Sequence, residues 1–201
     1  MIIKSIQIYR INNFYLSYQY MDLSDFRQSC TDRLIPIISV ETENFLWNIL
    51  KQNKPKVCLE IWSAVWYSSI FIANTIKERW WVLYSFEISY ASYLEGIQNI
   101  WKYGLKNLIV YPFDFQKVNL NKLIPNTVDF AFIDWQKNQY ANYLIKINNI
   151  LSTKYTLVCD DVIKFKSKMV QLYEYLEKNQ IYYNEFNMEK WDGIILIKSK
   201  L

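Results

Sequence analysis

The sequence predicts an α/β fold with a doubly wound, mostly parallel sheet. Short apolar runs with the length of buried strands alternate with longer segments of helical periodicity, and this alternation is typical of parallel βαβ units. The last two strand-like runs are separated by a short connection, which predicts that they pair as antiparallel neighbours. Most strand-like runs end in an acidic residue, so we expect carboxylates to gather at one edge of the sheet.

One stretch, residues 56–69, organises the rest of the chain. It contains a buried strand over Val57–Ile61, a tight turn, and a helix that begins near Tyr67. In an open parallel sheet such a turn lies at the carboxyl edge, where ligands bind and the next helix presents free N–H groups. We therefore predict that a nucleotide-type cofactor occupies this turn.

The remaining elements follow in chain order. Residues 1–40 are interpreted as a partly helical N-terminal arm, and residues 41–201 as one globular domain. Ser39 or Thr42 can cap a helix over residues 41–51, and the pair Lys54-Pro55 ends it. Further helices are expected over residues 68–79, 91–103, 140–152 and 167–179. Further strands are expected over residues 82–88, 108–111, 128–133, 155–159, 181–186 and 193–198.

Composition excludes several kinds of chemistry. The chain has 201 residues and no histidine, which excludes histidine-based triads, imidazole metal ligands and a histidine base. Its three cysteines lack a paired metal spacing, and Cys58 and Cys159 fall within predicted buried strands, which indicates packing. No apolar run approaches the roughly 18 residues of a membrane span, and the first residues lack the apolar centre of a signal peptide. We therefore expect a cytoplasmic protein without a membrane partner.

Glycine is scarce in this chain and tryptophan is abundant. An ordinary chain of this length has roughly 14 glycines, whereas this one has 3, together with 8 tryptophans. Left-handed turn positions favour glycine because it lacks a Cβ. The tryptophans at such positions are Trp62, Trp66, Trp80, Trp81 and Trp191. One hypothesis is that these are glycines encoded by UGA, a codon read as Trp in some genetic codes and as Gly in others. The alternative is that they are genuine tryptophans of an aromatic-rich protein, and the codons decide between the two.

Acidic residues lie at or just past the ends of the predicted strands. They are Glu60, Glu87, Asp114, Asp134, Asp160 and Asp161. The acid that ends the second strand stands where a ribose diol is usually held, and Asp114 could accept a hydrogen bond from an adenine amino group. The three aspartates after the later strands supply oxygen ligands that suit Mg²⁺. Each acid alone also fits a helix N-cap or a turn, but the set at one edge favours a cofactor crevice.

These motifs together resemble a known family. The segments that carry the resemblance are Leu59-Glu60-Ile61, Ser63, Tyr67-Ser68, Ser85-Phe86-Glu87, Asp129-Phe130, Phe132-Ile133-Asp134, Lys137, Tyr140, Cys159-Asp160-Asp161-Val162 and Asp192-Gly193. In this order they are similar to the class I S-adenosylmethionine-dependent O-methyltransferases of the catechol O-methyltransferase-like, metal-dependent group, over about residues 34–201. The resemblance implies a Rossmann-like methyltransferase domain. The family has glycine where this chain has Trp62, Trp66 and Trp191, and it usually has Asn where this chain has Asp161.

The resemblance also implies roles for individual residues. Those assigned to S-adenosylmethionine are Glu60, Trp62, Ser63, Tyr67, Ser68, Glu87, Asp114 and Asp134. Those assigned to a divalent cation, expected to be Mg²⁺, are Asp134, Asp160 and Asp161. Lys137 would be the general base, because a neighbouring cation and partial burial would both lower its pKa toward neutrality. The alternative for Lys137 is a solvated surface lysine.

The expected function is metal-assisted methyl transfer from S-adenosylmethionine to a hydroxylated aromatic small molecule or a hydroxylated tRNA base. The resemblance also implies a homodimer. Just past the aspartates, Lys164, Lys166 and Lys168 either meet a phosphate backbone or form a solvated helix start. The alternative function is a catalytically inactive binding module on the same fold. In that case the side chains of Trp62 and Trp66 block the cofactor crevice.

Overall fold

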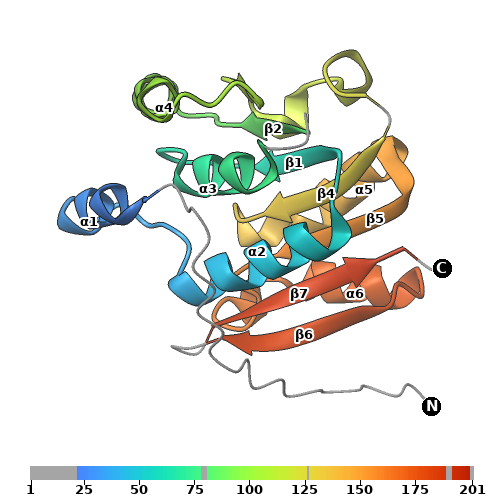
Figure 1. Cartoon of the computed structure of the whole chain (residues 1–201). Helices are drawn as coiled ribbons and strands as arrows, with labels where there is room; N and C mark the ends of the chain where they lie inside the picture. The colour runs from blue at the N-terminus through green and yellow to red at the C-terminus, as the bar shows by residue number, and fades with distance from the viewer. Residues whose placement is uncertain (1–21, 78–80, 126, 189–191, 200–201) are drawn as a thin grey trace.

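The computed structural model describes residues 22–77, 81–125, 127–188 and 192–199. A seven-stranded sheet runs through it in the order β3-β2-β1-β4-β5-β7-β6 (Figure 1). Its strands are β1 (Val57–Ile61), β2 (Val82–Phe86), β3 (Leu108–Tyr111), β4 (Val128–Ile133), β5 (Leu151–Cys159), β6 (Tyr183–Met188) and β7 (Asp192–Lys198). Strands β1 to β5 pair in parallel, whereas β7 is antiparallel to both β5 and β6. The predicted fold class is therefore confirmed, including the antiparallel C-terminal pair.

The strand ends that matter for function are in register. Ile61 at the end of β1 pairs with Phe86 of β2 and with Ile133 of β4, and Ile133 pairs in turn with Cys159 of β5. The residues that follow these four ends are Trp62, Glu87, Asp134 and Asp160. They consequently share one edge of the sheet. Because the strand order reverses at β1 and β4, this edge is also the switch point where open α/β sheets bind ligands.

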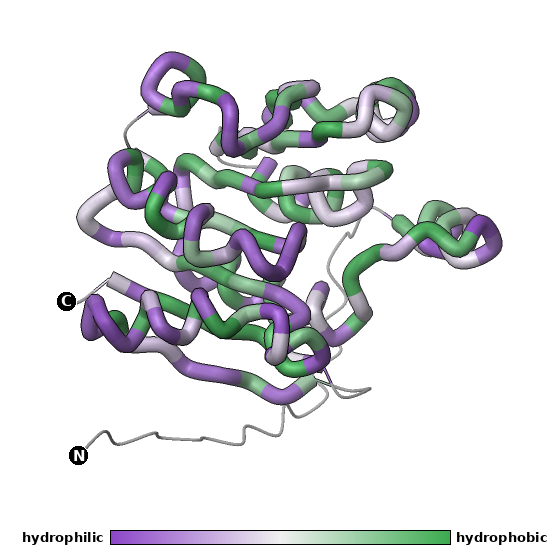
Figure 2. Tube along the Cα trace, turned by 180° about the vertical axis from the view of Figure 1, so that it is seen from behind, coloured by the Kyte–Doolittle hydropathy of each residue, from purple (hydrophilic) through white to green (hydrophobic). Residues whose placement is uncertain are grey.

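Helices cover both faces of the sheet (Figure 1). One face carries α1 (Ser24–Asp32), α2 (Val40–Asn53), α3 (Tyr67–Ile76) and α4 (Tyr90–Tyr103), and the other carries α5 (Tyr140–Ile147) and α6 (Val170–Lys178). Successive strand residues point to opposite faces, so Cys58 lies in the first core and Leu59 in the second. Figure 2 shows the apolar residues concentrated in the central strands. Within the described ranges, no helix is long and apolar enough to cross a lipid bilayer.

Two predicted boundaries need comment. The helix expected to reach Ser152 ends at Ile147, and after a short 3₁₀ turn, η5 (Asn148–Ile150), the chain enters β5 at Leu151. Pairing of Leu151 with Val128 of β4 outweighs the local helical pattern, so this end of the prediction is wrong. The division of the chain at residue 40 stays a prediction, although the described part of the arm shares the core of α2 and α3.

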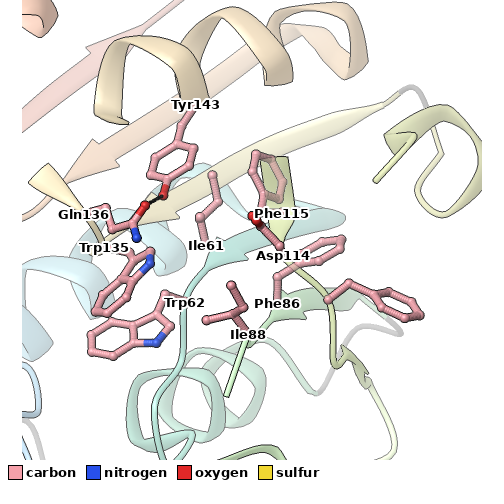
Figure 3. Close-up of a pocket in the computed structure, with 10 residues that line it drawn as sticks. Ile61, Trp62, Phe86, Ile88, Asp114, Phe115, Trp135, Gln136 and Tyr143 are labelled. Carbon is pink, nitrogen blue, oxygen red and sulfur yellow. Dashed lines mark hydrogen bonds between the residues drawn. The ribbon is translucent and has the colours of Figure 1, made fainter. Parts of the chain in front are cut away.

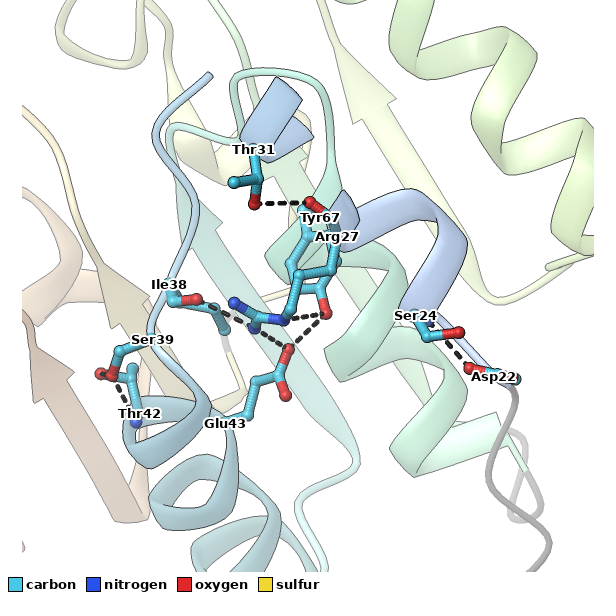
Figure 4. A network of polar contacts seen from close by, with 9 residues as sticks. All are labelled: Asp22, Ser24, Arg27, Thr31, Ile38, Ser39, Thr42, Glu43 and Tyr67. Atoms are coloured by element: carbon cyan, nitrogen blue, oxygen red, sulfur yellow. Dashed lines mark hydrogen bonds and ion pairs between the residues drawn. The ribbon is translucent and has the colours of Figure 1, made fainter. Parts of the chain in front are cut away.

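A polar network ties α1 to the start of α3 (Figure 4). The Arg27 guanidinium donates to the Tyr67 hydroxyl at 3.1 Å and to the Ile38 carbonyl at 3.0 Å, and it pairs with Glu43 of α2. The Tyr67 hydroxyl in turn donates to Glu43 at 2.5 Å. The hydroxyl of Tyr67 thus binds residues of α1 and α2, and the predicted contact of Tyr67 with the cofactor stays a prediction.

The indole of Trp66 lies directly against a glycine of α4. Trp66 is fully buried, and its indole N–H donates to the Ser92 carbonyl at 3.2 Å. A Cβ added to Gly96 would lie 1.5 Å from Cδ1 of Trp66. Gly96 therefore makes the room that this large side chain occupies.

This packing predicts a strong coupling between the two positions. Gly96→Ala should destabilise the chain by about 1–3 kcal/mol, because it overpacks the site. In a Trp66→Gly chain the same substitution should be neutral or stabilising by about 0.5–1 kcal/mol, because alanine favours the helix. Urea unfolding of the four chains of this double-mutant cycle measures the coupling. Additive effects of the two substitutions would contradict the packing described here.

Candidate active site

The turn after β1 has the backbone of a glycine-rich loop. Trp62 and Trp66 both have φ of 73°, and Ala64 between them has φ of 47°. The backbone N–H of Trp66 donates to the Ser63 carbonyl at 2.7 Å and closes the turn. Left-handed backbone costs a residue with a Cβ roughly 1–2 kcal/mol. The predicted demand for glycine-like backbone at positions 62 and 66 is therefore confirmed.

The backbone does not decide which residue the native protein carries at these positions. Whether Trp62 and Trp66 are genuine or misread glycines stays a prediction. Trp81 directly precedes β2, and whether it stands for a glycine also stays a prediction. Trp80 and Trp191 fall outside the described residues.

Two indoles stack in the crevice at the carboxyl edge (Figure 3). The ring centres of Trp62 and Trp135 are 3.8 Å apart, and their planes are inclined by 28°. The cavity beside them has a volume of about 40 Å³, which holds a few water molecules at most. Sites for small molecules usually have about 300–1,000 Å³, so this cavity by itself is too small for a nucleotide cofactor. The residues that line the cavity are Ile61, Trp62, Phe86, Ile88, Phe113, Asp114, Phe115, Trp135, Gln136 and Tyr143.

Trp62 also reaches the acid that was expected to hold a ribose. The buried carboxylate of Glu87 accepts from the backbone N–H groups of Ala64 at 2.8 Å and Ser89 at 2.7 Å. Burial raises the pKa of Glu87, and these backbone donors together with the Trp62 side chain oppose the rise. The indole of Trp62 therefore interacts with Glu87, the carboxylate that was predicted to bind the ribose hydroxyls.

A buried network surrounds Glu60 at the end of β1. The hydroxyls of Ser69 and Ser85 donate to its Oε2, the latter at 2.6 Å, whereas its Oε1 has no hydrogen-bond partner among the residues that the structure describes. Burial raises the pKa of Glu60 to about 7, although the hydroxyls of Ser68, Ser69 and Ser85 oppose the rise. An unpartnered buried acceptor is the place where a ligand ammonium would fit.

Some supporting residues of this network were not predicted. Ser85 pairs with Glu60 across β1 and β2, and its hydroxyl also bonds to that of Ser63. The signal for Ser85 was its position one residue before the end of a strand, directly opposite Glu60. Ser63 and Ser68 were predicted, and both are buried at this edge.

Asp114 lies at the rim of the crevice, as predicted. It lines the cavity and also caps a short 3₁₀ helix, η2 (Phe115–Lys117), by accepting from the Gln116 backbone N–H at 2.9 Å. Asp114 therefore caps a turn and also faces the cavity, and its contact with an adenine amino group stays a prediction. Trp135 was missed by the sequence reasoning, although it directly follows the acid that ends β4.

The other half of the edge is built around Lys137. This residue begins the 3₁₀ helix η4 (Lys137–Gln139). Its Nζ donates to Asp134 Oδ1 at 2.6 Å and to the Tyr140 hydroxyl at 3.1 Å, and it lies 2.7 Å from Asp161 Oδ2. The Tyr140 hydroxyl donates to the Asp160 carbonyl at 3.0 Å. One ammonium thus links the ends of β4 and β5.

This arrangement reverses the expected titration of Lys137. Burial lowers the pKa of Lys137, but the carboxylates of Asp134 and Asp161 outweigh it, so the pKa is raised. The expected lowering toward neutrality depends on a neighbouring divalent cation and stays a prediction. Lys137 is nonetheless no solvated surface lysine, because its side chain is only 14% exposed.

The three predicted metal ligands do not form a metal site as they stand. Lys137 lies between Asp134 and Asp161, and the third aspartate, Asp160, is buried so that its pKa is well above its ordinary value. Over the part of the chain that the structure describes, no three His, Cys, Asp or Glu residues are grouped to hold a metal ion. The oxygen ligands have the hardness that Mg²⁺ prefers, but the cation would have to displace the ammonium.

Fold and edge together define a doubly wound α/β protein with acidic residues gathered at its switch point. Residues 17–192 match the family model for O-methyltransferases. The chain therefore belongs to the O-methyltransferase family.

Solved structures share the fold at low sequence identity. The O-methyltransferase from Bacillus cereus, solved in complex with SAH, is 18% identical with a TM-score of 0.77, and the match covers 92% of this chain and 94% of that one. TomG from Streptomyces achromogenes, an O-methyltransferase of tomaymycin synthesis solved with SAM, is 15% identical with a TM-score of 0.76, covering 92% and 93%. The SAH-bound methyltransferase PaMTH1 from Podospora anserina is 16% identical with a TM-score of 0.71, covering 94% and 100%.

The raised pKa of Glu60 predicts a pH dependence of stability. Its folded pKa of about 7 lies above the ordinary value of 4.5, so the protonated form stabilises the folded chain. This contribution is complete below about pH 4.5 and is lost as the pH rises to about 7. Over this window the free energy of unfolding of the parent should fall by on the order of 3 kcal/mol more than that of Glu60→Gln. Urea unfolding at both ends of the window tests this, and an identical pH dependence of the two chains would contradict it.

The ammonium of Lys137 predicts a competition with divalent cations. Lys137→Met removes the ammonium and leaves Asp134 and Asp161 free, so Mg²⁺ or Mn²⁺ should bind about tenfold more tightly, which corresponds to about 1.4 kcal/mol. Lys146→Met is the matched control, because the Lys146 ammonium donates to the Gln116 carbonyl and not to these aspartates. Calorimetric metal titration of the three chains measures the effect. If the parent binds the metal as tightly as Lys137→Met does, the ammonium does not compete with the cation. That result would contradict this prediction and support the three-aspartate metal site.

Proposed function

We propose that this chain is an S-adenosylmethionine-dependent O-methyltransferase that acts on a hydroxylated aromatic small molecule or a hydroxylated tRNA base. The observation that carries the proposal is Oε1 of Glu60, a fully buried acceptor without a partner at the end of β1. Leaving such an acceptor unpaired costs about 1–3 kcal/mol. The methionine end of S-adenosylmethionine carries an ammonium that would pair with it.

The order of acids along the edge supports the same cofactor. Glu60, Glu87 and Asp114 follow or end β1, β2 and β3 in turn, and these strands are neighbours in the sheet. A cofactor with an ammonium, a ribose diol and an adenine amino group presents donors in the same order. The relatives solved with SAH and SAM have the same fold, which further supports this choice.

Lys137 stands where the acceptor would react. Its raised pKa keeps it positively charged at neutral pH, so it would first have to release one proton to solvent. The neutral amine would then take the proton of the acceptor hydroxyl, and the ammonium formed in this way would stabilise the oxyanion. Acting as the general base would require the neutral amine, and therefore release from Asp134 and Asp161. Because these aspartates serve Lys137, no step is assigned to a divalent cation, and metal assistance stays a prediction.

One observation favours the second candidate, an inactive binding module. The Trp62–Trp135 stack reduces the crevice to a cavity of about 40 Å³, and the Trp62 side chain already serves Glu87. If Trp62 is genuine and stays in place, the cofactor has no room. The enzyme therefore requires that Trp62 moves aside or that the native residue is glycine.

Calorimetric titration of S-adenosylmethionine distinguishes the two functions. Trp62→Gly should bind the cofactor about two- to tenfold more tightly than the parent, because an aromatic pair is worth about 0.5–1.5 kcal/mol beyond its burial. Trp101→Ala is the control, since Trp101 is 81% exposed on α4 and its loss leaves the crevice unchanged. Equal binding by the parent would show that Trp62 is no obstacle and exclude the blocked module. No binding by either chain would contradict the proposed enzyme.

A further inference from the structure

Three lysines surround one aromatic ring beside the proposed reaction centre. The ammonium groups of Lys164 and Lys168 lie 5.3 Å and 5.2 Å from the ring centre of Phe165, and that of Lys137 lies 5.8 Å from it. Phe165 is partly buried and packs against the same core as β4 and β5. A single ring thus connects Lys137 with two further positive charges.

The charges of Lys164 and Lys168 are available to a ligand. Both side chains are exposed, and neither forms an ion pair with a carboxylate that the structure describes. The lysine between them differs, because Lys166 pairs with Glu185 at 3.3 Å and lies over the ring of Tyr173. Asp161 forms its ion pair with Lys137 at 2.7 Å, and Lys164 acts on this carboxylate only as a nearby positive charge that helps to lower its pKa.

The segment that carries these lysines is anchored at both ends. The backbone N–H of Val162 donates to the Gly193 carbonyl at 2.9 Å, and the side chains of Val162 and Met169 are fully buried. Within the segment the N–H of Lys168 donates to the Phe165 carbonyl at 2.8 Å. The two lysines are therefore held on one ring rather than spread along a loose loop, and less entropy is lost when a ligand binds them.

We propose that Lys164 and Lys168 bind a phosphate of the methyl acceptor, so that the acceptor is a nucleotide or another phosphate-bearing molecule. The proposal rests on the proposed function, because that function places the reacting hydroxyl at Lys137. Lysine ammonium groups bind phosphate as point charges, and like charges gathered around one ring favour an anionic ligand. A neutral aromatic acceptor would leave both lysines unused.

Binding of two phosphate probes tests the proposal. The probes are uridine monophosphate and an oligouridylate of about ten nucleotides, each titrated into the full chain at several salt concentrations. The test variant is Lys164→Gln with Lys168→Gln. The control is Lys102→Gln with Lys106→Gln, which removes the same charge from exposed positions at the far end of the sheet, beside β3.

The test variant should bind phosphate about tenfold more weakly than the parent, and the control should bind as the parent does. For the oligouridylate, the slope of the logarithm of the binding constant against the logarithm of the salt concentration should also become shallower, by about 0.7 for each lysine removed. If the test variant loses affinity for both probes, the phosphate belongs to a small-molecule acceptor. If it loses affinity only for the oligouridylate, the phosphate belongs to an RNA strand. Failure of the parent to bind either probe, or equal weakening in test and control, overturns the proposal.

A parallel titration with S-adenosylmethionine keeps the two proposals separate. The variants are built in the Trp62→Gly chain, and the test pair should leave cofactor affinity unchanged, since neither lysine lines the crevice. Absence of cofactor binding in Trp62→Gly itself would contradict the proposed function. Unchanged phosphate binding in the lysine pair would contradict only the phosphate site.

Discussion

The parallel pairing of β1 with both β2 and β4 is the constraint on which the site depends. Ile61 is paired on both sides, so the three strands end at the same level. Strands β2 and β3 lie on one side of β1 and β4 and β5 on the other, so the strand order reverses at this point. Acidic residues far apart in the sequence, among them Glu60, Glu87 and Asp134, are brought to one edge by hydrogen bonds of the backbone alone. A slip of one residue would turn each of these side chains to the other face.

The turn after β1 combines a left-handed backbone with a large aromatic side chain. The backbone takes a left-handed conformation at positions 62, 64 and 66, which brings the chain back into α3 and allows Ala64 to donate to Glu87. The same conformation directs the indole of Trp62 into the crevice, where it stacks on Trp135. Glu60 beneath the turn meanwhile keeps an acceptor unpaired. The turn thus combines a strained backbone, an indole stack and a buried acceptor within a few residues.

Lys137 is the second organising group of the edge. Its ammonium compensates two carboxylates that would otherwise repel each other, and its bond to the Tyr140 hydroxyl joins the start of α5 to the end of β5. Through the ring of Phe165 it also lies beside the lysines that follow β5. The charge balance of this half of the site therefore rests on one residue, and that explains why its pKa is raised despite burial.

The sequence by itself determined the sheet, the order of its elements and the acids at its edge, because burial periodicity and strand-end position are local properties. It also identified positions 62 and 66 as needing a glycine-like backbone. Only the tertiary structure decided how the side chains use that edge: the Trp62–Trp135 stack, the bonding of Tyr67 to α1 and α2, and the placement of Lys137 between Asp134 and Asp161. These depend on distances between residues that lie on different elements, and such distances follow from packing in three dimensions and not from spacing along the chain.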